Sequence, residues 1–181
     1  RPHSGLRADV GASMHLIETT LKLLIITGLK DPWYMRRADW SALPDFGKTL
    51  IDMPVPNVVI GHSAGIMCLS RSACINDVLG IQRDHQGRDW NDIGPNFLVG
   101  GNGDVFEGRG ANLVGIMVSG WNSISITVMF LGNYVNDMPT PEQFANVNSL
   151  LEELVRVGAL NPDYVVLGHC QATPLIYWHH N

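Results

Sequence analysis

The sequence carries little charge and few basic residues. Only 16% of its 181 residues are Asp, Glu, Lys or Arg, and the 12 basic residues are outnumbered by 17 acidic ones, which gives a formal net charge of −5. Proteins that bind nucleic acid need clustered Lys and Arg to neutralise phosphates, so nucleic acid is excluded as a main partner. The 45% of hydrophobic residues excludes an intrinsically disordered chain.

Cysteines and long apolar runs are also scarce. Three cysteines are too few for a small scaffold held together by disulfides, and a chain of this length buries enough surface to form one core. The most apolar stretch near the N-terminus, residues 21–29, contains Lys22 and is shorter than the roughly 20 residues that cross a bilayer. No membrane anchor is visible in this sequence, which starts at Arg1.

Glycine and proline divide the chain into two parts. Residues 1–35 have no clear periodicity and are interrupted by Gly5, Gly28 and Pro32, so we expect an N-terminal extension there. Residues 36–181 have the patterning of one compact domain.

Short apolar runs alternate with helical patterns along this domain. β-Branched runs and period-2 alternation predict strands, and apolar residues at i, i+3 and i+4 predict helices. The expected order is a strand at 57–60, a helix at 73–82, a hairpin of 97–99 with 105–107, a strand at 124–130, a helix at 140–157 and a strand at 164–167. Alternation in the 124–130 strand predicts one apolar face. The order favours an α/β fold with a mixed central β-sheet flanked by helices.

The 140–157 helix has the clearest boundaries. Thr140 is a good N-cap, Pro141 suits the first helical turn, Gln143 completes a capping box and Gly158 supplies the stop. Its expected core stripe is Phe144, Val147, Leu151 and Leu154.

Several segments of the domain resemble the peptidoglycan recognition protein family. The run DIGPNFLVGG at 92–101 matches a family segment that usually has Tyr at the place of Pro95. FEGRG at 106–110, GWNSISI at 120–126, FLGNY at 130–134 and LGH at 167–169 resemble further family segments in the family's order. The resemblance covers about residues 37–169. It implies a peptidoglycan recognition or amidase-type fold with a groove for muramyl peptides. Some family members are zinc amidases, and others bind without cleaving.

The resemblance also implies where a catalytic zinc would be held, by two His and one Cys assisted by a Tyr. Gly61 stands at the first ligand position and His169 at the second. The third is missing, because residues 171–174 read QATP, and Pro95 stands at the Tyr position. His62 does not replace Gly61, since neighbouring side chains on a strand point to opposite faces. We therefore expect no zinc and only a vestigial His169.

Two alternatives stay open for these residues. His62, His169 and Cys170 together would form a shifted zinc set, although the adjacent side chains of His169 and Cys170 should diverge. Otherwise His62 is a core or second-face histidine. His169 is then a polar residue at a strand end, hydrogen-bonded in the groove floor.

The resemblance places other residues in the peptide groove. Ser63 matches a Thr or Ser that is able to donate to the peptide. The remaining candidates are His62, Arg109, Asn112, Asn122 and His169. For Arg109, a structural role is the alternative.

Two substitutions and one residue pair bear on the expected contacts in the groove. Met117 replaces a groove histidine, and Ala111 replaces a tryptophan. The pair Asn112–Leu113 leans toward lysine-type rather than diaminopimelate-type stems. Losing one buried hydrogen bond to a ligand costs about 0.5–1.5 kcal/mol, so a non-binding protein is a further alternative.

The resemblance pairs Cys68 with Cys74 in a disulfide, which implies an oxidising compartment. Cys170 is left over as a buried free thiol or an intermolecular partner. A family helix that normally follows His169 is missing here, so we expect a shortened C-terminus. The terminal pair His179–His180 is expected to be a solvated tail.

The sequence thus predicts a pattern-recognition protein that binds bacterial peptidoglycan in innate immunity and has no amidase activity or cofactor. It would be secreted, or the extracellular domain of a membrane protein, with other recognition proteins as further partners. The alternatives are a zinc-dependent N-acetylmuramoyl-L-alanine amidase and a regulatory partner of other recognition proteins that binds no peptidoglycan.

Overall fold

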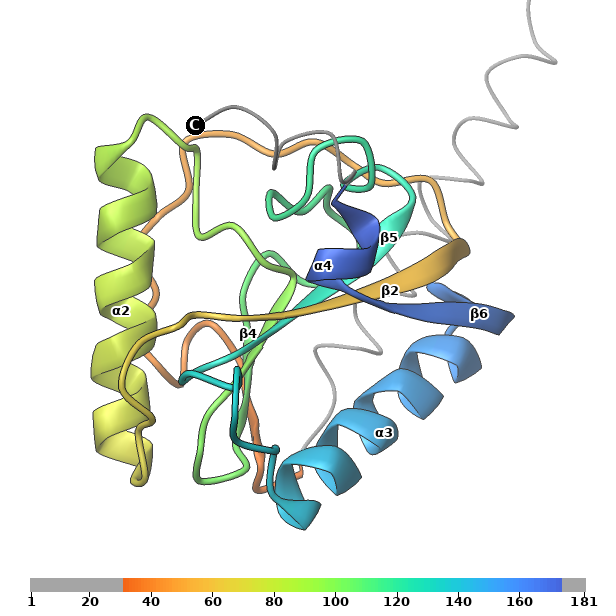
Figure 1. The fold of residues 1–181 in the computed structure, drawn as a ribbon. Coiled ribbons are helices and arrows are strands. Elements are labelled where there is room, and N and C mark those ends of the chain that lie inside the picture. Colours follow the sequence, from red (N-terminus) through yellow and green to blue (C-terminus); the bar gives the residue numbers. More distant parts are fainter. Residues whose placement is uncertain (1–30, 174–181) are drawn as a thin grey trace, which may run out of the picture.

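A computed structural model describes residues 31–173 (Figure 1). The extension expected at 1–30 and the tail at 174–181 lie outside the described residues. The elements from β2 to β6 follow the predicted order, and β1 and α4 were not predicted. The bounds are β1 Tyr34–Met35, β2 Val55–His62, α2 Arg71–Gly87, β3 Phe97–Val99, β4 Val105–Glu107, β5 Ser125–Phe130, α3 Pro141–Arg156, β6 Leu160–Gly168 and α4 His169–Ala172. None of the described helices is long and apolar enough to cross a membrane.

The six strands within residues 31–173 form one mixed sheet in the order β1-β4-β3-β5-β2-β6. Among the pairings of these strands, the β3–β4 hairpin is antiparallel and the other four are parallel. The prediction of a mixed central sheet is therefore confirmed. β2 lies between β5 and β6 and pairs Gly61 with Met129 and His62 with Phe130, so the ends of these strands lie together.

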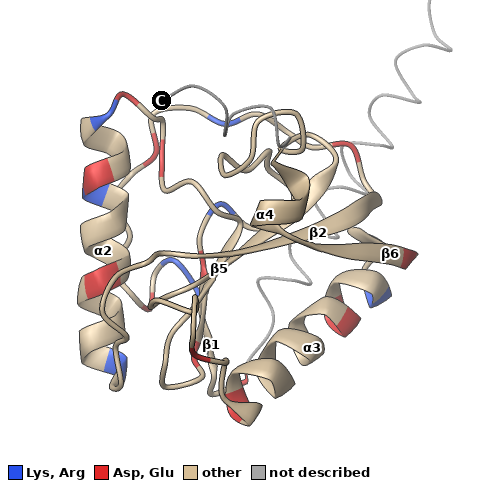
Figure 2. Cartoon of the chain, viewed as in Figure 1, with Lys and Arg blue, Asp and Glu red and all other residues tan. Residues whose placement is uncertain are grey.

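The sheet has helices on both faces because its strand residues alternate between two cores. Phe97 and Val99 pack in the core that includes Leu150 and Leu154 of α3, whereas Leu98 packs in the core that includes Val78 of α2. α2 and α3 accordingly cover opposite faces (Figure 1). Figure 2 shows acidic and basic positions interspersed along α2 rather than gathered as one basic surface.

The expected domain start needs a correction of two residues. Tyr34 and Met35, placed with the extension by the sequence pattern, form β1 and pair in parallel with Val105 and Phe106 of β4. A two-residue strand is too short to show a period, so its pairing becomes visible only in the sheet.

The apolar face expected for the 124–130 strand is present, because Ile126, Val128 and Phe130 are buried in one core, although Ile124 is 43% exposed. Ser125 and Thr127, on the other face, are buried as well. The small polar residues face a side of the sheet that other chain segments cover. Ser125 Oγ donates to Trp121 O at 2.7 Å, and Thr127 Oγ1 lies 2.7 Å from Asn96 Oδ1.

Helix α3 has the predicted caps but a different buried stripe. Thr140 Oγ1 accepts from Gln143 N, Gln143 Oε1 accepts from Thr140 N, and Gly158 follows the helix with φ of +72°. Gln143 is buried because its Nε2 also donates to Gly100 O and to the Tyr134 hydroxyl, each at 2.9 Å. Phe144 is 44% exposed, contrary to the prediction, because the neighbouring Gln143 takes the inward position.

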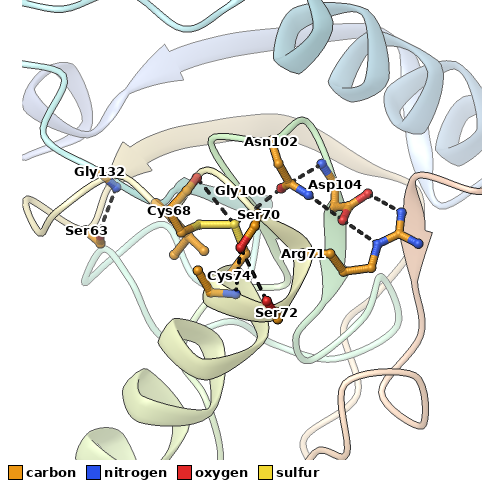
Figure 3. Close-up of a disulfide and its surroundings, with 12 residues drawn as sticks. Ser63, Cys68, Ser70, Arg71, Ser72, Cys74, Gly100, Asn102, Asp104 and Gly132 are labelled. Carbon is orange, nitrogen blue, oxygen red and sulfur yellow. Dashed lines mark hydrogen bonds and ion pairs between the residues drawn. A yellow bond between two sulfur atoms is a disulfide. The ribbon is translucent and has the colours of Figure 1, made fainter.

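The predicted disulfide is confirmed, and Cys68 and Cys74 join the loop after β2 to the first turn of α2 (Figure 3). Ser70 caps the helix by accepting from Ala73 N. Arg71 forms two hydrogen bonds of 2.7 Å with the carboxylate of Asp104, which directly precedes β4. The start of α2 is therefore fastened both to its own loop and to the hairpin.

The side chain of Asn96 connects three segments of the buried interior. Its Nδ2 donates to Gly110 O at 2.7 Å and Leu113 O at 2.8 Å, and its Oδ1 accepts from Thr127 N at 2.9 Å. Asn96 has no exposed surface. It therefore joins the start of β3 to β5 and to the loop after β4.

We expect loss of the disulfide to lower the free energy of unfolding by about 2 kcal/mol, because the bridge closes a short loop in the unfolded chain. The change is Cys68→Ala with Cys74→Ala, measured by urea unfolding. Cys170→Ser is the matched control and should change this free energy by less than about 0.5 kcal/mol, since the exposed Cys170 is outside the bridge. Equal losses in both proteins would contradict the assignment.

We expect Asn96→Ala to destabilise the fold by about 3 kcal/mol, because it leaves two buried carbonyls and one buried N–H without partners. Thermal and urea unfolding measure the loss. Asn148→Ala, at an exposed position of α3, is the control and should be near neutral. A loss below about 1 kcal/mol at position 96 would show that the network contributes little.

Candidate functional site

Gly61, near the end of β2, faces the end of β6. A Cβ atom built on Gly61 would lie 3.6 Å from His169 Cβ and 3.5 Å from Met117 Sδ. A side chain at position 61 would thus point at His169, as expected for two ligands of one metal. Glycine supplies no ligand, and the thioether of Met117 lies against this position.

The surface around Gly61, here called the floor, is apolar. Met117 and Trp121 pack there against the buried residues Val59, Val118 and Ala172. Asn122 holds this loop in place, because its Oδ1 accepts from Met117 N at 3.0 Å and Val118 N at 2.9 Å. The side-chain oxygen of Asn122 is therefore used inside the protein.

His62 lies on the opposite face of β2 from Gly61, as strand alternation predicted. Its Nδ1 accepts from Tyr134 N at 3.1 Å, and the two rings are 6.5 Å apart in an edge-to-face arrangement. His62 is exposed, so the core alternative is wrong. His62 pairs with Phe130 at the end of the strand, which agrees with the alternative of a histidine on the second face.

His169 and Cys170 begin α4 directly after β6. Both are exposed, and His169 Nδ1 lies 3.5 Å from Thr173 Oγ1. The alternative of a buried thiol is wrong for Cys170, because α4 turns it outward at the end of an edge strand. Within residues 31–173, no three His, Cys, Asp or Glu side chains are grouped to hold a metal ion. His62, His169 and Cys170 therefore do not form the shifted zinc set.

These three residues instead line an apolar cavity of about 510 Å³, here called the β6 cavity. The other lining residues are Ile60, Gly61, Phe130, Tyr134, Pro139, Phe144 and Gly168. Tyr134 and Phe144 were not predicted at a site. Little in the sequence indicated that these two residues line a cavity. Tyr134 belongs to the FLGNY segment, and Phe144 was expected in the core stripe of its helix.

A second and more polar space of about 410 Å³, here called the α2 cleft, lies between the end of β2 and α2. It is lined by His62, Ser63, Gly80, Ile81, Asp84, His85, Arg88 and Met129. Ser63 Oγ accepts from Gly132 N at 2.9 Å (Figure 3), which orients the hydroxyl at the rim. The cleft is on the same sheet face as the floor, because Met129 is the register partner of Gly61.

Sequence reasoning missed the polar side chains that α2 contributes to this cleft. Asp84 and Arg88 form an ion pair of 2.8 Å, and His85 lies between them in sequence. Their i, i+4 spacing is a helical signal, but the predicted helix stopped at residue 82. The real helix continues to Gly87.

The structure does not place Arg109 in either cavity. Its Nε donates to Ile93 O at 2.7 Å, and its Nη1 and Nη2 donate to Val114 O and Asp92 O. Burial lowers the pKa of the guanidinium, with Asp92 partly opposing this shift. These contacts give Arg109 the structural role that was its alternative.

Asn112 is not among the residues that line the two cavities. It is half-buried in the loop after β4, and its carbonyl oxygen accepts from Ile51 N at 3.0 Å. Pro95, at the position of the family Tyr, is buried, and its carbonyl oxygen accepts from Arg109 N at 3.1 Å.

The residues present do not fit a catalytic zinc. Such a site needs three convergent protein ligands and an open position for water. Among residues 31–173, His169 is the one group of the right kind at the floor, because position 61 lacks a side chain and position 117 holds a thioether. No catalytic step through a metal can be built on this set.

Comparisons with known proteins identify the family. A family profile described as N-acetylmuramoyl-L-alanine amidase matches residues 51–179. Peptidoglycan-recognition protein SC2 of Drosophila simulans is 38% identical over 136 residues, which cover 75% of this chain and 74% of the relative. Peptidoglycan recognition protein 1 of Mus musculus is 36% identical over 151 residues, which cover 81% of this chain and 83% of the relative.

Two solved structures are similar in fold. Peptidoglycan recognition protein-LE, solved in complex with tracheal cytotoxin, a monomeric diaminopimelic acid-type peptidoglycan, has a TM-score of 0.76 and 33% identity over 78% of this chain and 85% of that one. The ectodomain complex of recognition proteins LCa and LCx with the same ligand gives a TM-score of 0.75 and 35% identity, over 78% and 86%. With its mixed sheet, matching segments and disulfide, the chain belongs to the peptidoglycan recognition protein family, which is related to the N-acetylmuramoyl-L-alanine amidases.

Proposed function

We propose that this protein binds muramyl peptides of bacterial peptidoglycan without cleaving them, as a recognition protein of innate immunity. The observation that carries the proposal is the combination of a polar α2 cleft with a floor that lacks metal ligands on the same sheet face. Relatives of this fold have been solved with a peptidoglycan fragment bound.

The floor supports binding rather than catalysis. An amidase of this type needs zinc to acidify water and to polarise the scissile carbonyl. Here Gly61 and Met117 leave His169 alone, and Pro95 has no hydroxyl to assist. We therefore propose no cofactor. The zinc amidase remains the alternative, and released stem peptide would identify it.

The α2 cleft offers groups that match a peptide with free carboxylates. Arg88 is exposed and cationic, and the Ser63 hydroxyl is a donor. His62 is at the strand end, where it lines both cavities, and its ring has a second nitrogen beyond the one that accepts from Tyr134. Asn122 contributes by holding the Met117 loop. Asn112 stays a predicted contact, together with the lysine-type preference drawn from it. Recognition by such groups needs directed hydrogen bonds, and each charged one contributes about 1.5–3 kcal/mol.

Two further proposals concern place and partners. The disulfide supports an oxidising compartment, so the domain would be secreted or extracellular. The LCa–LCx complex supports pairing with another recognition protein. A regulatory partner that binds no peptidoglycan is the second candidate function, because Met117 is apolar where the family has a histidine.

Binding and cleavage are tested together by calorimetry with a muramyl pentapeptide and chromatography of the mixture. We expect heat of binding and an intact ligand. Arg88→Gln should weaken binding about tenfold, because it removes one charge-assisted hydrogen bond. Arg156→Gln, another exposed arginine paired along its helix, is the control and should bind like the parent. Free stem peptide would identify an amidase, whereas no heat would favour the regulatory partner.

We expect Gly61→His to create neither zinc binding nor amidase activity. The new imidazole would face His169, but the third ligand is still missing and Met117 lies where the side chain would extend. Zinc is measured by elemental analysis after dialysis, and activity by release of stem peptide. One zinc per protein together with released peptide would show that the floor holds a further ligand.

A further inference from the structure

His85 connects the wall of the α2 cleft to the segment beneath it. It lies in the last turn of α2, lines the cleft and is half-buried. Its Nδ1 accepts from Gly94 N at 2.9 Å, and its ring lies 4.5 Å from the ring of Trp90 at an interplanar angle of 34°. The imidazole is thus fixed by one hydrogen bond and one ring contact.

Gly94 connects His85 to the Met117 loop at the floor. Its carbonyl oxygen accepts from Ile116 N at 2.7 Å, and Ile116 is followed by Met117, which covers Gly61. A Cβ atom on Gly94 would overlap Ile116 O and come within 2.9 Å of the Trp90 ring. Only glycine allows such close packing at position 94. His85 in the wall of the α2 cleft, Gly94 and the Met117 loop therefore form one continuous chain of contacts.

The hydrogen bond to Gly94 requires a neutral imidazole. A backbone N–H is a donor, so Nδ1 must be an acceptor and the ring proton must be on Nε2. In an imidazolium both ring nitrogens are donors, and two donors would then face each other. Protonation of His85 therefore breaks the contact between α2 and Gly94.

The charged groups around His85 come from its own helix end and from the segments packed against it. Asp84 belongs to α2 and Arg88 directly follows it, while Asp92 and Arg109 lie in the segments packed against the helix. The carboxylates favour the imidazolium and the guanidiniums oppose it. Burial has the largest effect, and it lowers the pKa of His85 below its usual value.

We propose that His85 is an acid-sensitive latch, which holds the cleft wall to the floor when neutral and releases it when protonated. The affinity for muramyl peptide would then fall on acidification. For a histidine whose pKa is lowered by folding, the stabilisation is complete above the ordinary pKa of about 6.5 and is lost as the pH falls through the folded value. The affinity part of this inference rests on the proposed function, whereas the latch itself does not.

The latch is tested first without ligand. The amide resonance of Gly94 is followed by ¹H–¹⁵N NMR from pH 8 to 4.5 in the wild type and in His85→Asn, whose side-chain oxygen is able to accept but not to titrate. We expect a titration below pH 6.5 in the wild type and none in the variant. A Gly94 amide that does not titrate, or that titrates equally in both proteins, would overturn the latch.

Binding is tested second, by calorimetry with muramyl pentapeptide at pH 7.5 and 5.0. The wild type should bind at least threefold more weakly at pH 5.0, and the affinity of His85→Asn should change by less than a factor of 1.5. His62→Asn removes the other histidine of the cleft and should keep the pH dependence. If this variant loses it and His85→Asn does not, His62 is the sensor and the proposal is wrong. Absence of binding at both pH values refutes the proposed function, and the Gly94 titration then decides the latch alone.

Discussion

The buried amide of Asn96 is the constraint on which the arrangement of this domain depends. A side chain with no exposed surface must satisfy its polar atoms internally, and Asn96 does so with Gly110, Leu113 and Thr127. These partners lie in the loop after β4 and in β5, which are far apart in sequence. Because the same amide fixes both, the segment that contains Gly94 and Pro95 has one position relative to the sheet. Gly94 in that segment is hydrogen-bonded both to His85, which lines the α2 cleft, and to Ile116, which precedes Met117 of the floor.

Much of the fold could be predicted because its signals are local. The caps of α3, the hairpin turn and the alternation in β2 depend on a few neighbouring residues, and alternation alone placed His62 on the face opposite Gly61. The failures have a common cause in tertiary contacts. Phe144 fits an apolar stripe, but Gln143 takes the inward position through bonds to Gly100 and Tyr134. Arg109 matches a family segment, yet backbone carbonyls use its donors. The side chains of Asp84, His85 and Arg88 followed the last recognisable apolar residue of α2, so no periodic signal marked them.

The two cavities differ in the chemical groups that line them. The β6 cavity has apolar and aromatic walls, whereas the α2 cleft brings together hydroxyl, imidazole, carboxylate and guanidinium groups. The floor near Gly61 lies on the same face as the α2 cleft. Gly61 and Met117 stand where the resemblance implies a metal ligand and a groove histidine, and they leave the floor apolar. The α2 cleft on the same sheet face keeps its polar lining.

The position of β6 at the edge of the sheet has a consequence for the behaviour of the protein at high concentration. β6 pairs with β2, and within residues 31–173 no strand pairs with its other side. Unpaired strand edges are templates for the addition of a strand from another molecule. Pro162 and Asp163 oppose this in the first half of β6, through a missing donor and a charge. Val165 and Val166, 53% and 48% exposed, have no such protection. Self-association should therefore begin at these two valines, and its extent depends more on them than on the net charge of −5.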